Sequence, residues 1–235
     1  MGMGIGISLT KGGRRQLLPT DLDLLSWWKA DQGTYQDDGL TTPATADADP
    51  VGGLLDLASS RHLLQATGTK RGTLKLNIKN GLPVIRFDGV DDNLAVTWAL
   101  NQPYTRFAVW QHRSVQNGSK YIMDGGGDRA VLYFTAANTL TMYAGTNLNA
   151  SGSFSNDTFY ITRETFNGAS SKIQVNGGTV VTGNAGASAM TMFTMSHPSF
   201  PADVDFGEAF LVNGEPSADQ VAAMFAYLNG RWGVY

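Results

Sequence analysis

The C-terminal stretch, residues 205–235, constrains the fold of this chain more than any other part. A short apolar run over 206–212 leads into Asn213-Gly214, a dipeptide typical of turns. Beyond that turn, apolar residues recur at the three- and four-residue spacing of one helix face: Val221, Met224, Phe225 and Leu228. The sequence therefore predicts a strand, a turn and one closing amphipathic helix.

The ends of that helix also carry signals. Ser217, with Gln220 three positions later, predicts a capping box at the N-terminus, and Gly230 is expected to be the C-terminal cap. Trp232 extends the apolar stripe. We expect Trp232 and Leu228 to be buried against the sheet that the helix covers.

The pattern of the remaining sequence predicts a series of short strands. The 28 glycines and the charged fraction of only 16% favour a turn-rich antiparallel protein. Asn176-Gly177 predicts a hairpin turn in which both residues have positive φ. Asn167-Gly168 is expected to form a second hairpin loop. Strands rich in β-branched and aromatic residues are expected at 24–29, 84–87, 94–96, 106–112, 121–123, 130–134, 139–143, 159–166, 172–175, 179–182, 191–195 and 206–212.

Four segments in this order resemble one known family. They are 25–31 (LSWWKAD), 83–94 (PVIRFDGVDDNL), 173–178 (IQVNGG) and the GE strand with its helix and closing Trp-Gly. They are similar to the laminin-G-like, concanavalin A-type domains of bacteria and their phages. The resemblance covers residues 20–235. It implies an all-β, antiparallel two-sheet jelly-roll sandwich with one C-terminal helix, here residues 19–235. It leaves function open, since this fold serves lectins, glycosidases, lyases, adhesion modules and virion proteins.

Residues 1–18 differ from the rest and are expected to form an extended N-terminal arm. Met3, Ile5 and Ile7 alternate with glycine, a period that suits a strand with one apolar edge. Lys11, Arg14 and Arg15 give residues 1–16 a net charge of +3. We expect these six side chains to bind a partner's sheet edge or groove. A frayed terminus is the alternative interpretation.

Composition also restricts partners and location. Beyond the arm, 14 basic residues against 20 acidic ones leave a net charge of −6, which argues against a nucleic-acid-binding domain. The chain has no cysteine, so it has neither disulfides nor thiolate metal sites. No apolar run approaches the roughly 20 residues of a membrane span, and the start does not resemble a signal peptide. We expect synthesis in a host cytoplasm.

Carboxylates on the last strand raise the question of catalysis. Asp203, Asp205 and Glu208 loosely match the E-x-D-x-x-E strand of bacterial β-glucanases, to which the fold resemblance extends. Retaining enzymes of that kind place two carboxylates roughly 5–5.5 Å apart. The nucleophile position here would be the shorter Asp203, and Gly207 weakens the strand. We therefore predict that Glu208 is the ordinary Glu of the GE strand and that no residue is catalytic.

Two acidic turns are the candidates for a metal site. Asp88, Asp91 and Asp92 cluster around a glycine, and a second turn spans 124–128. Either could supply oxygen ligands for calcium, although Asp-Gly pairs are more often plain turns. The three histidines lie on unrelated elements and are expected to be structural or on the surface. Four aromatic residues could stack on a sugar or belong to the core, and the sequence does not separate these roles: Trp98, Tyr104, Tyr133 and Tyr143.

The function expected from these features is non-enzymatic. A tailed-phage virion component, either a capsid decoration protein or a tail-associated one, is the first expectation. The arm would contact other virion proteins, the protein would form a homo-oligomer within the particle, and a cell-surface glycan is a further ligand. The first alternative is a free carbohydrate-binding module, which predicts a solvent-exposed aromatic pair on the concave sheet and has no need for the arm. The second is a β-glycan hydrolase, which requires Asp205 and Glu208 in an exposed groove.

Overall fold

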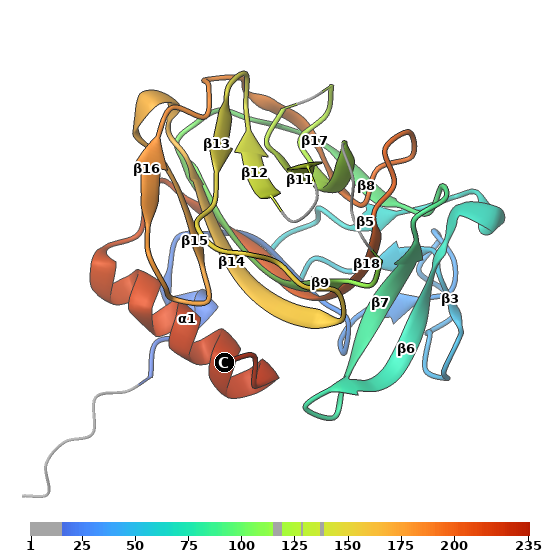
Figure 1. Cartoon of the computed structure of the whole chain (residues 1–235). Helices are drawn as coiled ribbons and strands as arrows, with labels where there is room; N and C mark the ends of the chain where they lie inside the picture. Colours follow the sequence, from blue (N-terminus) through green and yellow to red (C-terminus); the bar gives the residue numbers. More distant parts are fainter. Residues whose placement is uncertain (1–15, 115–118, 128, 137–138) are drawn as a thin grey trace, which may run out of the picture.

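The computed structural model describes residues 16–114, 119–127, 129–136 and 139–235, and shows two antiparallel β-sheets stacked face to face. One helix, α1 (Ala218–Trp232), lies against the outer side of one sheet (Figure 1). The predicted fold class, an all-β two-sheet sandwich with a single C-terminal helix, is confirmed.

Within the described residues each sheet has nine strands. Sheet A, in spatial order, contains β16 (Val181–Gly183), β15 (Ser171–Val175), β14 (Thr158–Phe166), β9 (Tyr104–His112), β18 (Asp203–Asn213), β7 (Leu82–Asp88), β6 (Gly72–Lys79) and β3 (Pro50–Val51), with β1 (Leu24–Lys29) paired to β18. Sheet B contains β13 (Asn147–Asn149), β12 (Thr139–Tyr143), β11 (Val131–Ala136), β10 (Lys120–Asp124), β17 (Met190–Met195), β8 (Leu94–Leu100), β5 (Leu63–Leu64), β4 (Gly53–Leu54) and β2 (Thr34–Tyr35). Three short 3-10 helices are η1 (Pro19–Asp21), η2 (Gly68–Lys70) and η3 (Gly168–Ser170).

Strand β18 organises sheet A. It pairs with β9 along its length, with β7 through its first half and with β1 through its second half. A β-bulge between Phe206 and Glu208 shifts the alternation of side chains by one residue. As a result Val204, Phe206 and Ala209 point into the core between the sheets, whereas Phe210 points toward the helix.

The molecule has two apolar cores. The larger one lies between the sheets, and the smaller one lies between sheet A and α1. Leu228 and Trp232 are fully buried in the smaller core, as the sequence predicts. A Cβ on Gly207 would lie 2.6 Å from Trp232 Cζ2, so the bulge needs glycine because the indole rests directly on the backbone.

The structure confirms the capping box predicted at the start of α1 but not the cap predicted at its end. Gln220 N donates to Ser217 Oγ, and Ser217 N donates to Gln220 Oε1. Gly230 lies inside the helix, and the left-handed cap residue is Gly233, with φ of 58°. The helix continues for two residues past Gly230 because Trp232, four residues after Leu228, extends the buried stripe.

The predicted strands all exist, with ends shifted by a few residues. The expected strand at 106–112, for example, begins at Tyr104, and the one at 179–182 occupies Val181–Gly183. Asn176 and Gly177 have φ of 51° and 67°, which confirms the predicted turn conformation. Strand β6 and several two- and three-residue strands, such as β2 and β3, were not predicted.

Within the described ranges, no helix has the length and apolar character that a bilayer crossing requires.

Candidate functional site

The carboxylate of Glu208 lies at the centre of a buried hydrogen-bond network under α1. Its Oε1 accepts from Trp27 Nε1 at 2.8 Å and from the Tyr227 hydroxyl at 3.0 Å. Its Oε2 accepts from Trp232 Nε1 at 3.0 Å and lies 3.1 Å from Arg231 Nε. Burial, followed by the Glu208 charge, raises the pKa of Tyr227, which therefore stays a donor. Through these hydrogen bonds Glu208 links β1 and the helix to β18.

Asp205 has a similar structural environment. It is fully buried, and Arg86 binds it through two nitrogens at 2.8 and 2.9 Å while Gln111 Nε2 donates at 2.7 Å. Asp203 forms an ion pair with Arg113. Because both Asp205 and Glu208 are enclosed by donors, these two carboxylates do not form the exposed pair that glycoside hydrolysis requires. The predicted structural interpretation of this strand fits their geometry.

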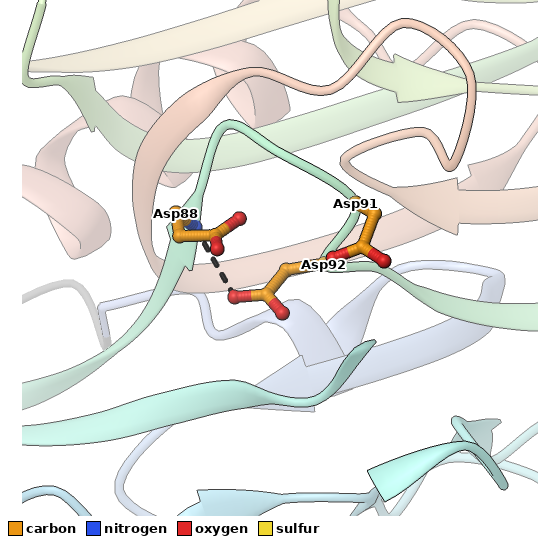
Figure 2. A group of neighbouring side chains, drawn as sticks. All are labelled: Asp88, Asp91 and Asp92. Carbon is orange, nitrogen blue, oxygen red and sulfur yellow. Dashed lines mark hydrogen bonds between the residues drawn. The ribbon is translucent and has the colours of Figure 1, made fainter. Parts of the chain in front are cut away.

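The acidic turn after β7 brings three carboxylates together (Figure 2). Asp88, Asp91 and Asp92 each offer an oxygen within 4.8 Å of the others. Val90 N donates to Asp88 Oδ1, which is the bond of an ordinary Asx turn, and Asp88 N donates to Asp92 Oδ2 across the turn. Burial, followed by the neighbouring Asp88 charge, raises the pKa of Asp92 to about 6. The cluster offers three ligand groups, fewer than the six to eight oxygens that calcium takes.

The second acidic turn contains Asp124, whose Oδ2 accepts from Gly126 N; Asp128 lies outside the described residues.

The histidines occupy separate elements, as expected. His62 Nδ1 accepts from Asp56 N, and the rings of Trp110, Phe134 and Tyr160 surround His112. His197 lies near Asp124, with Nε2 3.7 Å from Oδ2.

The outer face of sheet B carries aromatic and amide side chains in register. Leu132, Phe134, Met142 and Ala144 point into the main core, so the alternating residues Tyr133 and Tyr143 point outward. Cross-strand pairing places Tyr121, Tyr133, Thr141 and Asn149 in one row, and Val131, Tyr143 and Asn147 in the next. We call Tyr121, Tyr133, Tyr143, Asn147 and Asn149 the tyrosine–asparagine face.

Hydrogen bonds hold this face in one arrangement. The Tyr133 hydroxyl donates to Asn147 Oδ1 at 3.0 Å, and the Thr141 hydroxyl donates to Asn149 Oδ1 at 2.9 Å. Both amide oxygens are thus used, which orients each Nδ2 as a donor for another group. Both asparagines are exposed, and among the residues that the structure describes neither Nδ2 has a partner.

Phe200 extends the aromatic surface beyond the strands. Its ring is 4.8 Å from that of Tyr121, and the residue is 39% exposed. The ring of Tyr121 is in turn 5.3 Å from that of Tyr133. Phe200 and Tyr133 are the exposed parts of this aromatic cluster, and buried Tyr121 packs between them. Aromatic rings beside amide donors suit a ligand with both apolar and hydroxyl groups.

Of the four aromatic residues named from the sequence, two are buried and two lie on the outer face of sheet B. Tyr104 is fully buried, and Trp98 is 7% exposed with the Arg61 guanidinium 4.3 Å above its ring. Tyr133 and Tyr143 lie on the outer face. Sequence reasoning missed Tyr121, Phe200 and the two asparagines. The alternation of Tyr133 with Leu132 and Phe134 indicates that Tyr133 faces the side opposite to these two residues, but it does not indicate which side is the core.

The predicted arm residues Met3, Ile5, Ile7, Lys11, Arg14 and Arg15 lie outside the described residues.

No family model matches the sequence, and no curated protein matches it. Solved structures do match its fold. A Trypanosoma rangeli sialidase in complex with sialic acid has a TM-score of 0.59 at 14% identity, over 86% of this chain and 32% of the sialidase. Domain 4 of AbnA, an extracellular GH43 arabinanase of Geobacillus stearothermophilus in complex with arabinotriose, has a TM-score of 0.57 at 11% identity. That match covers 87% of this chain and 98% of the arabinanase domain.

A GH54 α-L-arabinofuranosidase is similar over 79% of this chain, with a TM-score of 0.58 at 12% identity. The chain spans about a third of the sialidase and 52% of the arabinofuranosidase. At these identities the similarity shows the shared sandwich fold.

Proposed function

We propose that this protein is a non-enzymatic glycan-binding module and that the tyrosine–asparagine face is its binding surface. The observation that carries the proposal is the pair of partly exposed tyrosines, Tyr133 and Tyr143, beside oriented asparagine amides on the outer face of sheet B. The carbohydrate-binding alternative drawn from the sequence predicts an exposed aromatic pair on one sheet.

The chemistry of the face complements that of a sugar. One side of a sugar ring is lined by C–H groups, which pack against an aromatic ring, while its hydroxyls need hydrogen-bond partners. Tyr133 supplies the ring, and its hydroxyl bond to Asn147 fixes the donor beside it. Because the strands hold these groups in register before the ligand arrives, little side-chain entropy is lost on binding.

The similar structures are consistent with this function. The arabinanase domain that this chain matches almost completely is a sandwich solved with arabinotriose, and the matching sialidase was solved with sialic acid. Shared fold alone does not assign a ligand. The proposal therefore depends on the surface of this chain, and the comparisons guide the choice of oligosaccharides to test.

A glycan array that includes arabino-oligosaccharides tests the proposal, followed by calorimetry on the strongest ligand. We expect Tyr133→Ala to weaken binding at least tenfold, equivalent to about 1.4 kcal/mol. Asn147→Ala should have a similar effect. Tyr235→Ala is the matched control, because Tyr235 is 56% exposed and lies on another surface. Binding that survives Tyr133→Ala, or the absence of any glycan ligand, would refute the proposal.

We propose in addition that the arm, residues 1–18, attaches the module to a larger assembly such as a phage virion. The alternating Met3, Ile5 and Ile7 and the +3 charge support this role. Capsid or tail proteins would be the partners, and a homo-oligomer within the particle would present several glycan-binding faces.

A further inference from the structure

A second surface, unrelated to the tyrosine–asparagine face, lies on the other side of the molecule's main core. Helix α1 covers the middle of sheet A and leaves strands β15 and β16 extending beside it (Figure 1). Between the helix and these strands is an open groove with a volume of about 1100 Å³. This is slightly larger than the roughly 300–1,000 Å³ of small-molecule sites.

Strand register defines the floor of the groove. Arg163 on β14 pairs with Gln174 on β15, and Lys172 on β15 pairs with Thr182 on β16. Their side chains lie on the helix side of sheet A, since the alternate residue Ile173 belongs to the core between the sheets. The floor is therefore polar, whereas the wall formed by Val221 and Phe225 is apolar.

The floor carries an excess of positive charge at the end near the N-terminus of α1. Arg163 Nη2 and Lys172 Nζ both bind the same oxygen, Glu215 Oε1, at 3.0 and 2.5 Å. Burial acts to raise the pKa of Glu215, but the bonds and charges of Lys172 and Arg163 hold it below the ordinary value. One carboxylate thus pairs with two cations, and among the described residues no other charged side chain lines the groove.

Two further polar atoms at this end lack partners. Arg163 Nε and Gln174 Oε1 are buried and, within the described part of the chain, neither has a hydrogen-bond partner. Arg163 is 4% exposed and Gln174 is 9% exposed. A donor and an acceptor on paired residues of adjacent strands match the N–H and C=O of one residue in an extended peptide, which point to the same side.

The helix wall permits close approach along its whole length. Ala218, Ala222 and Ala226 recur every four residues on the exposed side of α1 and line the groove. From Ala218 to Asn229 the helix rises about 17 Å, the length of roughly five residues of extended chain. Gln174 on the floor is an amide side chain, a type that binds peptide backbone readily; its Nε2 donates to Gly178 O, and its Oε1 remains to accept from a ligand. Asn229 at the far end binds the backbone of Val234 and Tyr235 and closes that end of the groove.

We propose that this groove binds a short, extended, acidic peptide segment of a partner protein. A carboxylate of the peptide would lie against Lys172 and Arg163 near the start of the helix, where the helix dipole also favours negative charge. Apolar side chains of the peptide would pack along Val221 and Phe225. The site is separate from glycan binding, and either function can fail without the other.

The probe is a pooled library of acetylated hexapeptides with apolar residues at the first five positions and Glu at the last. Matched libraries carry Gln or Lys at that position. Retention by the immobilised full-length protein is quantified by mass spectrometry, and retained peptides are resynthesised for fluorescence polarisation. We expect the Glu library to be retained at least tenfold more than the Lys library.

Two variants locate the binding. Ala222→Trp fills the groove from an exposed helix position, and Lys172→Glu reverses the charge of the floor; each should weaken binding of the retained peptides at least tenfold. Lys75→Glu is the charge control, because Lys75 also pairs with one carboxylate, Asp47, but does not line the groove. Circular dichroism and melting curves establish that each variant is folded.

Several results would overturn the proposal. These are equal retention of the three libraries, unchanged affinity in folded Ala222→Trp, or equal losses in Lys75→Glu and Lys172→Glu. Selective retention of acidic oligosaccharides with no peptide binding would assign the groove to a glycan. Concentration-dependent dimerisation that Ala222→Trp abolishes, again without peptide binding, would assign it to a second copy of this chain.

Discussion

Truncation of Trp232 to alanine tests how α1 is attached to the sandwich. The indole is fully buried, rests on Gly207 and donates to Glu208. Removal of a buried Trp side chain costs about 3–5 kcal/mol, including the cavity that remains. The buried Glu208 carboxylate also loses one donor while it keeps Trp27 and Tyr227, a further cost of about 1 kcal/mol. We therefore expect Trp232→Ala to lower the free energy of unfolding by about 4–6 kcal/mol.

Urea denaturation followed by tryptophan fluorescence and circular dichroism measures this change. Trp232→Phe keeps most of the packed ring and removes the N–H donor, so it should lose much less stability than Trp232→Ala. The difference between the two variants isolates packing from hydrogen bonding. A Trp232→Ala protein within about 1 kcal/mol of the parent, with an unchanged denaturant slope, would show that the helix contributes little to the fold.

Three other predictions follow from the same structure. Purified protein should release no reducing sugar from β-glucans, and Glu208→Gln should leave glycan binding intact; hydrolysis that this variant loses would contradict the non-enzymatic proposal. Because the raised pKa of Asp92 means that the folded chain holds its proton more tightly than the unfolded chain, its contribution to stability falls as pH rises from about 4 through 6. Compared with the parent, Asp92→Asn should therefore gain free energy of unfolding at pH 8 but not at pH 4, by up to about 3 kcal/mol. The same pH dependence of stability in parent and variant would refute this. Millimolar calcium that stabilises only the parent would indicate a metal site. Deletion of residues 2–16 should leave the melting temperature nearly unchanged and abolish incorporation into the particle; normal assembly of the truncated protein would refute the arm proposal.

Local sequence patterns predicted the elements that local physics determines. Ser217 and Gln220 are three residues apart, so their capping box depends only on the helix itself. Asn176-Gly177 adopts positive φ at both positions because these residues tolerate it at low cost. Strand β6 was missed although Leu74, Leu76 and Ile78 alternate with polar residues, since the run stands among loops and lacks aromatic residues.

The hydrogen-bond network around Glu208 could not be predicted in the same way, because it joins residues that are distant in the sequence. Trp27 and Glu208 are 181 positions apart, and nothing in either neighbourhood indicates that they bond. The two-residue periodicity of a strand also does not distinguish the side that faces the core from the side that faces solvent. Alternation shows that Tyr133 and Leu132 face opposite ways, but the direction of the core depends on how the sheets stack. The outward position of Tyr133 therefore required the structure.

Chemical-shift mapping tests the central claim most directly, since it locates glycan binding without relying on a variant. The isotope-labelled protein is titrated with the strongest ligand from the glycan array, and amide shifts are followed by two-dimensional NMR. The account predicts saturable shifts concentrated in β10, β11, β12 and β13, with the Asn147 and Asn149 side-chain amides among the largest. Shifts confined to the groove beside α1, or no saturable shifts with any glycan, would contradict it.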